Sequence, residues 1–324
     1  MMSTVTGSSA ASSALTGART RSLMVARTST VTQSCLSRTR RPSGYRPIGT
    51  AVGADRRPAG PLILAHRGSA RPDRPENTVA AADAALSAGA DGVEVDVRAS
   101  ADRKLVCSHD ADLFRLAGTP VPVRTRTAAA LRSVLLPGGH QLALLEELLS
   151  AVAGYGRRRV VVEAKACPDP AAALEVAGAL REVLAGFAAD LDITVSSFDP
   201  VLLGLVRTAL ADLGIGTALL GSAFEGAANL LRRALDDGHD EIHPNLFSLL
   251  RSPNVAETAR TLGVGVTCWT VNRARHVARL ADLGIDALIT DDAAGVRAAL
   301  RYRPRLSDRA GCSAGSLGND LAMR

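Results

Sequence analysis

The sequence predicts an α/β protein built as a single TIM-type (β/α)8 barrel, and three observations lead to this prediction. From residue 61 onward, short runs of Val, Ile and Leu alternate with Ala- and Leu-rich stretches of helical length. About eight such units occur in roughly 240 residues, the number and length typical of this barrel. Aromatic residues make up only 3% of the chain, so Ala, Leu and Val must fill the core, which suits helices packed on a parallel sheet.

The chain divides into three regions. Residues 1–60 are rich in Arg, Ser and Thr and show no sustained hydrophobic period, so we expect a disordered extension there. Residues 61–301 carry the alternating pattern of the barrel, whereas residues 302–324 lose it and are expected to form a flexible tail. No stretch approaches about 18 uninterrupted apolar residues, and the N-terminus lacks the apolar part of a secretory signal, so we expect no transmembrane segment.

Apolar runs mark nine candidate strands, one more than the barrel takes. They are residues 62–65, 93–97, 104–108, 160–165, 193–198, 217–220, 241–244, 264–271 and 287–290. Helices are predicted at residues 78–90, 144–154, 171–187, 201–214, 226–236, 255–263 and 274–284, with a last helix that ends near Leu300. The weakest strand predictions are 104–108 and 241–244.

The link before the third candidate strand is short. Only six residues separate Val97 from Lys104, too few for a crossover helix. An extended link of about six residues still reaches about 20 Å, so a parallel return without a helix is allowed.

Helix boundaries carry their own signals. Asn77-Thr78 precedes the first Ala-rich stretch as an N-cap, and Asp199 precedes a proline that suits the first turn of a helix. Gly89 and Gly284 end two helical stretches, where a left-handed residue is favoured.

The net charge of +6 is distributed unevenly. Residues 1–60 hold nine arginines against one acidic residue, and residues 301–324 hold five arginines against two. Residues 61–300 therefore hold 24 basic against 29 acidic residues, a net charge of −5. Because the core is acidic and the basic tails lack interleaved aromatic residues, the sequence does not indicate a nucleic-acid partner, and we interpret the Arg-rich extension as a solvated tail.

The five cysteines show no Cys-x-x-Cys spacing; they are Cys35, Cys107, Cys167, Cys268 and Cys312. Three of them lie inside or just after apolar strand-like runs. This pattern favours reduced thiols in a cytoplasmic protein over a disulfide framework or a zinc site.

In a parallel barrel, functional residues lie at the carboxyl ends of the strands, where the loops leading into the helices form an open mouth. Polar and aromatic side chains at these ends are His66, Arg67, Glu94, Asp96, His109, Asp110, Glu163, Lys165, Ser197, Phe198, Trp269 and Thr270. We therefore expect them to gather in one cavity.

Three carboxylates are expected at this mouth. Glu94 and Asp96 stand two residues apart on a predicted strand, so both side chains point to the same face, and Glu163 and Lys165 share this arrangement on another strand. Carboxylates in one cavity repel one another unless a positive charge lies between them. Hard oxygen ligands suit Mg²⁺ or Ca²⁺ better than zinc, so we predict a divalent metal at Glu94, Asp96 and Glu163. The alternative is an exposed strand edge or an arginine-paired surface.

Two of the six histidines, His66 and His109, directly follow apolar strand-like runs. A pair of histidines suits phosphoryl chemistry near neutral pH, because one accepts a proton from the nucleophile while the other donates one to the leaving oxygen. Each could instead be an ordinary hydrogen-bonded polar residue. His140 and His276 fall in a loop and in a helical pattern, and we expect no catalytic role for them.

Three further residues suit substrate binding. Arg67 offers a planar fork for a phosphate oxygen, unless it pairs with Glu76 or Asp96. Lys165 adds a second positive charge. Trp269, the only tryptophan of the chain, is predicted either to form an aromatic wall against the substrate or to pack in the core.

Short motifs occur in a fixed order between residues 62 and 300. They are HRG at 66–68, PENT at 75–78, GADGVEVDV at 89–97, LVCSHD at 105–110, EAK at 163–165, SSF at 196–198, CWTVN at 268–272 and LITD at 288–291. The ordered set resembles the glycerophosphodiester phosphodiesterase family, a branch of the phospholipase-C-like phosphodiesterase barrels. The chain departs from the family pattern in two places: Asp102-Arg103 stands where Asp-Gly is frequent, and LALLE at 142–146 stands where Pro-Thr-Leu-Glu is frequent.

The resemblance implies a metal-dependent hydrolase that cleaves glycerophosphodiesters to sn-glycerol 3-phosphate and an alcohol. A glycerol hydroxyl would attack phosphorus to give a cyclic phosphodiester, which water then opens. The implied roles are acid/base catalysis for His66 and His109, metal binding for Glu94, Asp96 and Glu163, phosphate binding for Arg67 and Lys165, and contact with the glycerol end for Trp269.

Other functions stay open. A lysophospholipase-D-like or sphingomyelinase-D-like activity would use the same barrel and would need an apolar groove for an acyl chain. A non-catalytic barrel that binds phosphate-bearing ligands is disfavoured by the intact histidines and carboxylates, and nucleic-acid binding through the tail is least expected. The expected partner is a small-molecule glycerophosphodiester; head group, choice of metal and oligomeric state are left open.

Overall fold

The computed structural model describes residues 60–301. The tails expected at residues 1–60 and 302–324 lie outside this range, apart from Gly60. The strands form a closed sheet, because β1 pairs in parallel with β2 on one side and with β9 on the other. The strands are β1 (Leu62–His66), β2 (Gly92–Ala99), β3 (Leu105–Cys107), β4 (Arg159–Ala164), β5 (Asp192–Ser197), β6 (Gly216–Gly221), β7 (Glu241–Pro244), β8 (Gly265–Cys268) and β9 (Ala287–Thr290).

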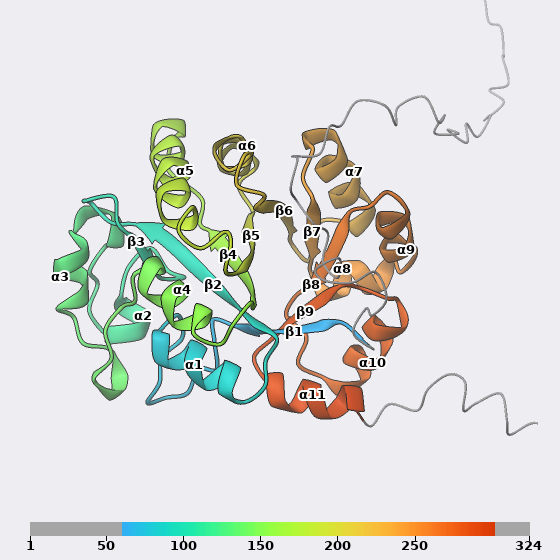
Figure 1. The fold of residues 1–324 in the computed structure, drawn as a ribbon, viewed down its shortest axis with the longest axis horizontal. Coiled ribbons are helices and arrows are strands. Elements are labelled where there is room, and N and C mark those ends of the chain that lie inside the picture. The colour runs from blue at the N-terminus through green and yellow to red at the C-terminus, as the bar shows by residue number, and fades with distance from the viewer. Residues whose placement is uncertain (1–59, 302–324) are drawn as a thin grey trace, which may run out of the picture. The chain divides into compact units, whose positions relative to one another are not determined.

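Helices surround the closed sheet and complete a barrel of eight parallel strands, which confirms the predicted (β/α)8 architecture (Figure 1). The α-helices are α1 (Val79–Ser87), α2 (Phe114–Ala117), α3 (Ala128–Arg132), α4 (Leu145–Ala153), α5 (Pro170–Leu184), α6 (Pro200–Ala209), α7 (Ala227–Asp237), α8 (Leu246–Arg251), α9 (Asn254–Thr261), α10 (Ala274–Asp282) and α11 (Ala293–Arg301). Two short 3-10 helices are η2 (Val123–Thr125) and η3 (Pro137–Gly139).

The predicted helix boundaries are confirmed in their main features. The Thr78 hydroxyl accepts a hydrogen bond from the Ala81 amide at 3.2 Å and caps α1, and the Asp199 carboxylate caps α6. Gly89 and Gly284 adopt left-handed conformations after α1 and α10. Asn77, grouped with Thr78 in the predicted cap, has another role described below.

The ninth candidate strand is β3, which pairs antiparallel with β2 instead of joining the barrel. The sequence analysis allowed the six-residue link to lead into a parallel strand, and this possibility is wrong. The link is a tight hairpin, in which the Ser100 amide donates to the Lys104 carbonyl at 2.9 Å and Arg103 adopts a left-handed conformation with φ of 60°. The other weak prediction, 241–244, is the barrel strand β7.

Between β2 and α4 the chain forms an insertion that carries β3, α2, η2, α3 and η3. None of these helices was predicted from the sequence. The insertion has its own apolar core, which consists of Val106, Leu113, Val123, Ala128, Leu131, Leu136 and Leu142. It lies on one side of the barrel, beside β2 (Figure 1).

Alternate residues of each barrel strand point inward. Leu64, Val161, Ala287 and Ile289 pack together inside the barrel. The intervening residues, such as Val95, pack against the surrounding helices. This alternation places side chains of two neighbouring parallel strands at the same height when they are register partners.

A polar cluster fills the barrel interior at the amino ends of the strands. Arg159, on β4, contacts the Glu241 carboxylate of β7 and donates hydrogen bonds to Thr194 Oγ1 at 2.7 Å and Asp192 Oδ1 at 3.0 Å. A Cβ atom at Gly265 would lie 2.8 Å from Glu241 Cγ, so a glycine is needed there to leave room for the glutamate. Arg159 and Glu241 are both buried.

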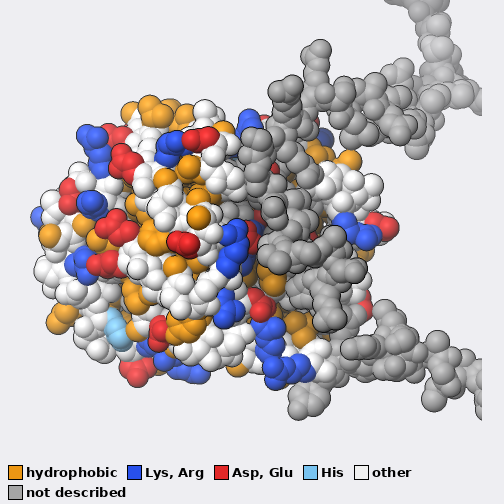
Figure 2. All heavy atoms as spheres, in the orientation of Figure 1, with side chains coloured by type: hydrophobic (Ala, Val, Ile, Leu, Met, Phe, Trp, Pro, Cys, Tyr) orange, Lys and Arg blue, Asp and Glu red, His pale blue; other side chains and the backbone are white. Residues whose placement is uncertain are grey.

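Among residues 60–301, no helix combines the length and apolar character needed to cross a bilayer. Basic and acidic side chains are interspersed over the face of this region that Figure 2 shows.

Candidate active site

Strand register brings the predicted site residues together at the carboxyl ends of β1, β2 and β4. His66 is the last residue of β1 and is the register partner of Glu94 on β2. Two residues further along β2, Asp96 is the register partner of Glu163 on β4. These four side chains therefore lie side by side at the mouth, as the sequence predicted.

The three carboxylates form one cluster. Glu94, Asp96 and Glu163 each offer an oxygen atom, and these atoms lie within 4.8 Å of one another. Lys165 reaches into the cluster, with its Nζ 2.6 Å from Asp96 Oδ1 and in contact with the Glu163 carboxylate. The Lys165 side chain thus places one positive charge between the carboxylates of Asp96 and Glu163.

The charges of the cluster do not balance. Burial and the nearby charge of Asp96 raise the pKa of Glu94 to about 8. Burial also raises the pKa of Glu163 despite its contact with Lys165. For Asp96 the effect of burial is outweighed by the charges of Lys165 and Arg67, which lower its pKa. The cluster therefore has a deficit of positive charge, located at Glu94 and Glu163.

This donor set fits a divalent metal. Oxygen ligands lie about 2.0 to 2.6 Å from Mg²⁺ or Ca²⁺, so one ion can bind oxygens that are about 4 to 5 Å apart. The spacing of up to 4.8 Å among Glu94, Asp96 and Glu163 meets this condition without movement of the backbone. A bound cation would also supply the charge that Glu94 and Glu163 lack, and Glu94, Asp96 and Glu163 are the residues that would hold it.

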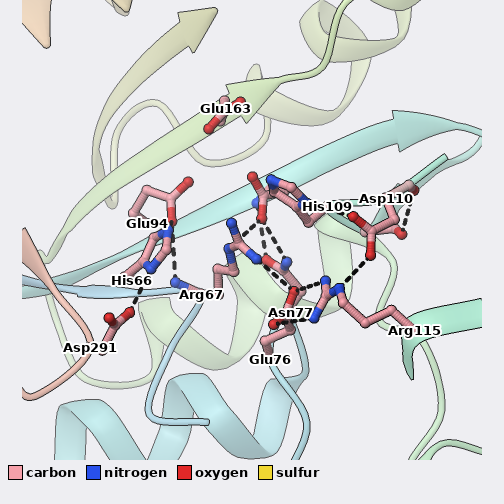
Figure 3. A network of polar contacts seen from close by, with 12 residues as sticks. His66, Arg67, Glu76, Asn77, Glu94, His109, Asp110, Arg115, Glu163 and Asp291 are labelled. Atoms are coloured by element: carbon pink, nitrogen blue, oxygen red, sulfur yellow. Dashed lines mark hydrogen bonds and ion pairs between the residues drawn. The ribbon is translucent and has the colours of Figure 1, made fainter. Parts of the chain in front are cut away.

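His66 is held between two carboxylates. Its Nδ1 donates a 2.6 Å hydrogen bond to Asp291 Oδ1, directly after β9, and its Nε2 lies 3.9 Å from Glu94 Oε2 (Figure 3). Burial opposes protonation of the ring, but the hydrogen bond to Asp291 and the charge of Glu94 prevail and raise the pKa of His66. The Asp291 contact fixes the tautomer, which leaves Nε2 on the side of the carboxylate cluster.

His109 reaches the mouth through the hairpin. The Ser108 amide donates to the Asp96 carbonyl at 3.0 Å, which sets the height of the next residue beside β2. Arg98 donates two hydrogen bonds to the His109 carbonyl, at 2.9 and 3.0 Å. The His109 Nδ1 donates to Asp110 Oδ1 at 2.8 Å, and burial lowers the pKa of the ring. Each of the two histidines therefore has a carboxylate at Nδ1.

Arg67 lies between the two histidines in the view of Figure 3. Its backbone amide donates to Glu94 Oε2 at 3.1 Å, and its Nη1 donates to Glu76 Oε1 at 2.9 Å. Its Nε lies 3.1 Å from Asp96 Oδ2. Both pairings considered from the sequence, with Glu76 and with Asp96, are thus present, and together they aim the guanidinium at the mouth.

Asn77 holds Asp96 from below the mouth. The Asn77 Nδ2 donates to Asp96 Oδ2 at 2.8 Å, while the Asp96 amide donates to Asn77 Oδ1 at 3.0 Å. Asn77 is fully buried and adopts a left-handed backbone conformation, with φ of 57°. Asparagine is among the few residues that tolerate this conformation, and only its amide both donates and accepts here.

Trp269 follows β8 and packs in the core, one of the two roles considered from the sequence; contact with the substrate stays a prediction. It is half-buried and packs against the apolar barrel interior, and its Nε1 donates to the His243 carbonyl at 2.9 Å. Its ring also meets the edge of Phe198, which follows β5, with ring centroids 5.6 Å apart. The tryptophan is anchored in the core and is also part of the mouth.

Several residues of the site were not predicted. Asp291 stands directly after β9, so the rule that selected the other strand ends could have found it. Glu76 and Asn77 lie in the PENT motif but were interpreted only as an ion-pair partner and a helix cap. Arg115, whose guanidinium donates hydrogen bonds to Glu76 and Asp110, has no local sequence signal, because its position depends on the packing of the insertion.

Comparison with known proteins agrees with this geometry. Residues 66–294 match the model of the glycerophosphoryl diester phosphodiesterase family. The chain is 31% identical over 248 residues to a Mycobacterium tuberculosis protein named probable glycerophosphodiester phosphodiesterase 1, covering 69% of this chain and 87% of that protein.

Two solved structures are also similar. A Thermotoga maritima glycerophosphodiester phosphodiesterase is 28% identical with a TM-score of 0.60, covering 75% of this chain and 98% of that one. An Oleispira antarctica phosphodiesterase in complex with the product sn-glycerol-3-phosphate is 24% identical with a TM-score of 0.67, over 75% and 98%. The family match spans most of the chain, including every residue of the mouth described above. The chain therefore belongs to the glycerophosphoryl diester phosphodiesterase family.

Proposed function

We propose that this protein hydrolyses glycerophosphodiesters to sn-glycerol 3-phosphate and an alcohol, with Mg²⁺ or Ca²⁺ as cofactor. One observation carries the proposal: two histidines with carboxylates at Nδ1 lie at the same barrel mouth as a cluster of three carboxylates that can hold a metal. Family membership supports the same reaction class.

Glu94, Asp96 and Glu163 are the proposed metal ligands. A divalent cation bound there would stabilise negative charge on the phosphoryl oxygens. Arg67 and Lys165 are the proposed phosphate-binding residues, because each places a positive charge beside the cluster while its carboxylate partners hold it in position. Trp269 offers an aromatic surface for the glycerol end.

His66 and His109 are the proposed acid/base pair. Each has Nδ1 hydrogen-bonded to a carboxylate, so Nε2 remains to exchange a proton with the substrate. One imidazole accepts the proton of the attacking glycerol hydroxyl, while the other protonates the leaving alkoxide oxygen. This first step would give a cyclic phosphodiester. In the second step of the reaction, water would open the cyclic phosphodiester, and the two histidines would transfer protons in the opposite direction.

The direct test measures release of glycerol 3-phosphate from glycerophosphocholine. Activity should require Mg²⁺ or Ca²⁺ and stop with EDTA, and His66→Ala and His109→Ala should each lose most turnover without unfolding. His276→Ala, a half-buried histidine on α10, is the control and should keep full activity. Metal-independent release, or an active His66→Ala/His109→Ala double variant, would contradict the proposed site.

Exposed phenylalanines favour a second candidate, a lysophospholipase-D-like activity on the same barrel. Phe198, Phe224 and Phe247 follow β5, β6 and β7, and their exposed fractions are 42%, 100% and 56%. Phe198 connects this rim to Trp269 through the ring contact described above. Exposed aromatic side chains in the loops that follow the barrel strands suit a substrate that carries an acyl chain.

The second candidate is tested by comparing lysophosphatidylcholine, sphingomyelin and glycerophosphocholine as substrates. If an acyl chain lies on the rim, Phe224→Ser should lower turnover of the acylated substrates and leave glycerophosphocholine unaffected. Leu174→Ser, with 62% exposure on α5, is the matched control. Equal rates for Phe224→Ser and the control on every substrate would exclude the rim as an acyl site.

A cytoplasmic location stays a prediction. It draws support from Cys107, Cys167 and Cys268, which are free cysteines within the described residues. The absence of a nucleic-acid partner also stays a prediction, and the alternation of basic and acidic side chains on the face in Figure 2 supports it.

A further inference from the structure

Arg115, in the short helix α2 of the insertion, contacts the partners of two proposed functional residues. Its Nε donates to Asp110 Oδ2 at 2.6 Å, and its Nη1 and Nη2 donate to the two oxygens of Glu76 at 3.0 and 2.6 Å (Figure 3). Three N–H groups of the guanidinium are thus engaged, one with Asp110 and two with Glu76, and these two carboxylates lie 34 residues apart in the chain.

Each of these two carboxylates also contacts a proposed functional residue at the barrel mouth. The second oxygen of Asp110 accepts the Nδ1 hydrogen bond of His109 at 2.8 Å. Glu76 Oε1 accepts from Arg67 Nη1 at 2.9 Å. A continuous chain of charge-assisted hydrogen bonds therefore runs from a proposed acid/base residue, through Arg115, to a proposed phosphate-binding residue.

This network differs from an ordinary surface ion pair, whose contribution is small. Arg115 binds Glu76 in a bidentate manner, and Glu76 is largely buried, with 15% of its side chain exposed. The hydrogen bonds that Arg115 donates to Glu76 raise the pKa of Arg115, and the cationic partners lower the pKa values of Glu76 and Asp110 against the effect of burial. All three groups are therefore held in their charged forms.

The insertion fixes where Arg115 stands. The preceding residue but one, Leu113, is fully buried in the separate core of the insertion, and its amide donates to the Val121 carbonyl at 3.1 Å. The Phe114 amide donates to Asp112 Oδ1 at 2.8 Å and begins the helical turn. The core of the insertion thus determines the position of a side chain that reaches back to the barrel mouth.

We propose that Arg115 is a positioning residue that couples the orientation of His109 to that of Arg67. The proposal rests on the proposed function, because it assigns no chemistry to Arg115 itself. Arg115 acts through Asp110 on proton transfer and through Glu76 on phosphate binding. The insertion is, on this view, part of the catalytic apparatus.

The contacts of Arg115 with Asp110 and Glu76 predict separable kinetic effects on glycerophosphocholine. Asp110→Asn should lower kcat with little change in KM, because His109 is the proposed functional residue that Asp110 contacts directly. Glu76→Gln should mainly raise KM, because Arg67 is the proposed functional residue that Glu76 contacts directly. Arg115→Ala should do both and lower kcat/KM by about 10- to 100-fold, the range typical when the support of a functional side chain is removed. Arg115→Lys, which keeps the charge but cannot hold both carboxylates, should fall between wild type and Arg115→Ala.

Arg181→Ala is the matched control. Arg181 has a similar exposure, 42% against 47%, and pairs with Asp212 in a comparable way at 2.5 Å, but it lies in the last turn of α5. The control should keep wild-type kcat and KM. Added guanidinium ion should restore part of the activity of Arg115→Ala, since the half-exposed site is accessible, and should not affect the control.

Nitrogen NMR of the histidine rings gives a readout that needs no turnover. In wild type and Arg181→Ala, His109 should show a single tautomer with Nδ1 protonated, whereas Arg115→Ala should show averaging of the two tautomers. A wild type without diesterase activity would contradict the proposed function alone. An unchanged His109 spectrum together with wild-type kcat and KM in folded Arg115→Ala would overturn the coupling. If Arg115→Ala fails to fold, Arg115→Lys with wild-type kinetics and an unchanged spectrum would overturn it equally.

Discussion

The two ends of the barrel interior both contain buried glutamates, but in opposite electrostatic states. At the amino end, burial would raise the pKa of Glu241, yet the Arg159 charge lowers it well below the usual range. At the mouth, the pKa of Glu94 is raised to about 8, because burial and Asp96 outweigh the neighbouring cations. A buried glutamate is thus stabilised in its charged form at the amino end and in its neutral form at the mouth.

This difference distinguishes the structural ion pair of Arg159 and Glu241 from the carboxylate cluster at the mouth, to which we assign a function. A balanced buried pair adds little net stability but becomes costly when one partner is lost. An unbalanced cluster is itself costly, and persists where function requires it. Variants at the mouth should therefore affect activity more than stability, and variants at the amino end should do the reverse.

The largest expected effect is loss of turnover in Glu94→Gln. Removing one of three metal ligands should lower kcat/KM on glycerophosphocholine by about 10⁴-fold, or about 5 kcal/mol in barrier. The melting temperature of the metal-free protein should not fall at neutral pH, because a carboxyl with a pKa of about 8 is mostly protonated there and the neutral amide resembles it. Mg²⁺ or Ca²⁺ should raise the melting temperature of wild type and not that of the variant. Glu257→Gln, an exposed acid on α9, serves as control; an active Glu94→Gln would refute the contrast between the ends.

Next in size is the stability loss of Arg159→Met. Without the guanidinium, the buried Glu241 carboxylate keeps its contacts with Thr194 and His243 but loses its arginine, which should cost about 3 to 5 kcal/mol of the free energy of unfolding, measured with urea. The double variant Arg159→Met/Glu241→Gln should recover much of this loss, since no buried charge is left. Activity per folded molecule should stay near wild type. A change below about 1 kcal/mol would mean that the amino end tolerates the loss of the arginine beside Glu241.

His239 provides a pH test at the amino end. It is buried before β7, its Nδ1 is hydrogen-bonded to Thr217 Oγ1, and burial lowers its pKa to about 4. Between about pH 6.5, the unfolded value, and pH 4, the unfolded chain binds more protons than the folded one. Stability should therefore be complete above pH 6.5 and should fall by up to about 3 kcal/mol as pH approaches 4.

The measurement is urea unfolding of wild type and His239→Gln across this pH range. The variant lacks the titrating ring, so its stability should depend less steeply on pH. Parallel curves for the two proteins would show that the acid sensitivity arises elsewhere in the chain.

The smallest expected effect concerns two left-handed residues near the mouth. Arg103 is exposed, and its φ of 60° in the β2–β3 hairpin strains a side chain that glycine lacks. Arg103→Gly should therefore raise the free energy of unfolding by about 0.5 to 1 kcal/mol, without a change in activity. Asn77→Gly relieves the same conformation but removes the amide that holds Asp96, so it should lose activity. If Asn77→Gly keeps full activity, the hydrogen bonds of the Asn77 amide to Asp96 have no functional role.

Most of the barrel could be predicted from sequence because its units are local. Apolar runs, caps at Thr78 and Asp199, and terminal glycines each depend on a few neighbouring residues. The third strand could not be assigned in the same way, because its antiparallel direction depends on the turn at Arg103, where the sequence lacks the expected glycine.

The sequence could predict those residues of the candidate site that lie at the carboxyl ends of barrel strands. His66, Glu94, Asp96 and Glu163 meet because register aligns β1, β2 and β4. The supporting groups, above all Arg115, follow from packing within the insertion, which has no periodic pattern to reveal it.

The contact between His66 and Asp291 joins the two ends of the barrel sequence. His66 ends the first strand and Asp291 follows the last, 225 residues later, across the β1–β9 pairing that closes the sheet. During synthesis the ribosome must therefore release almost the whole barrel before this pair forms. A nascent or truncated chain that carries the carboxylate cluster but not β9 would have an unsupported His66, so recovery of activity during refolding should report the moment of closure.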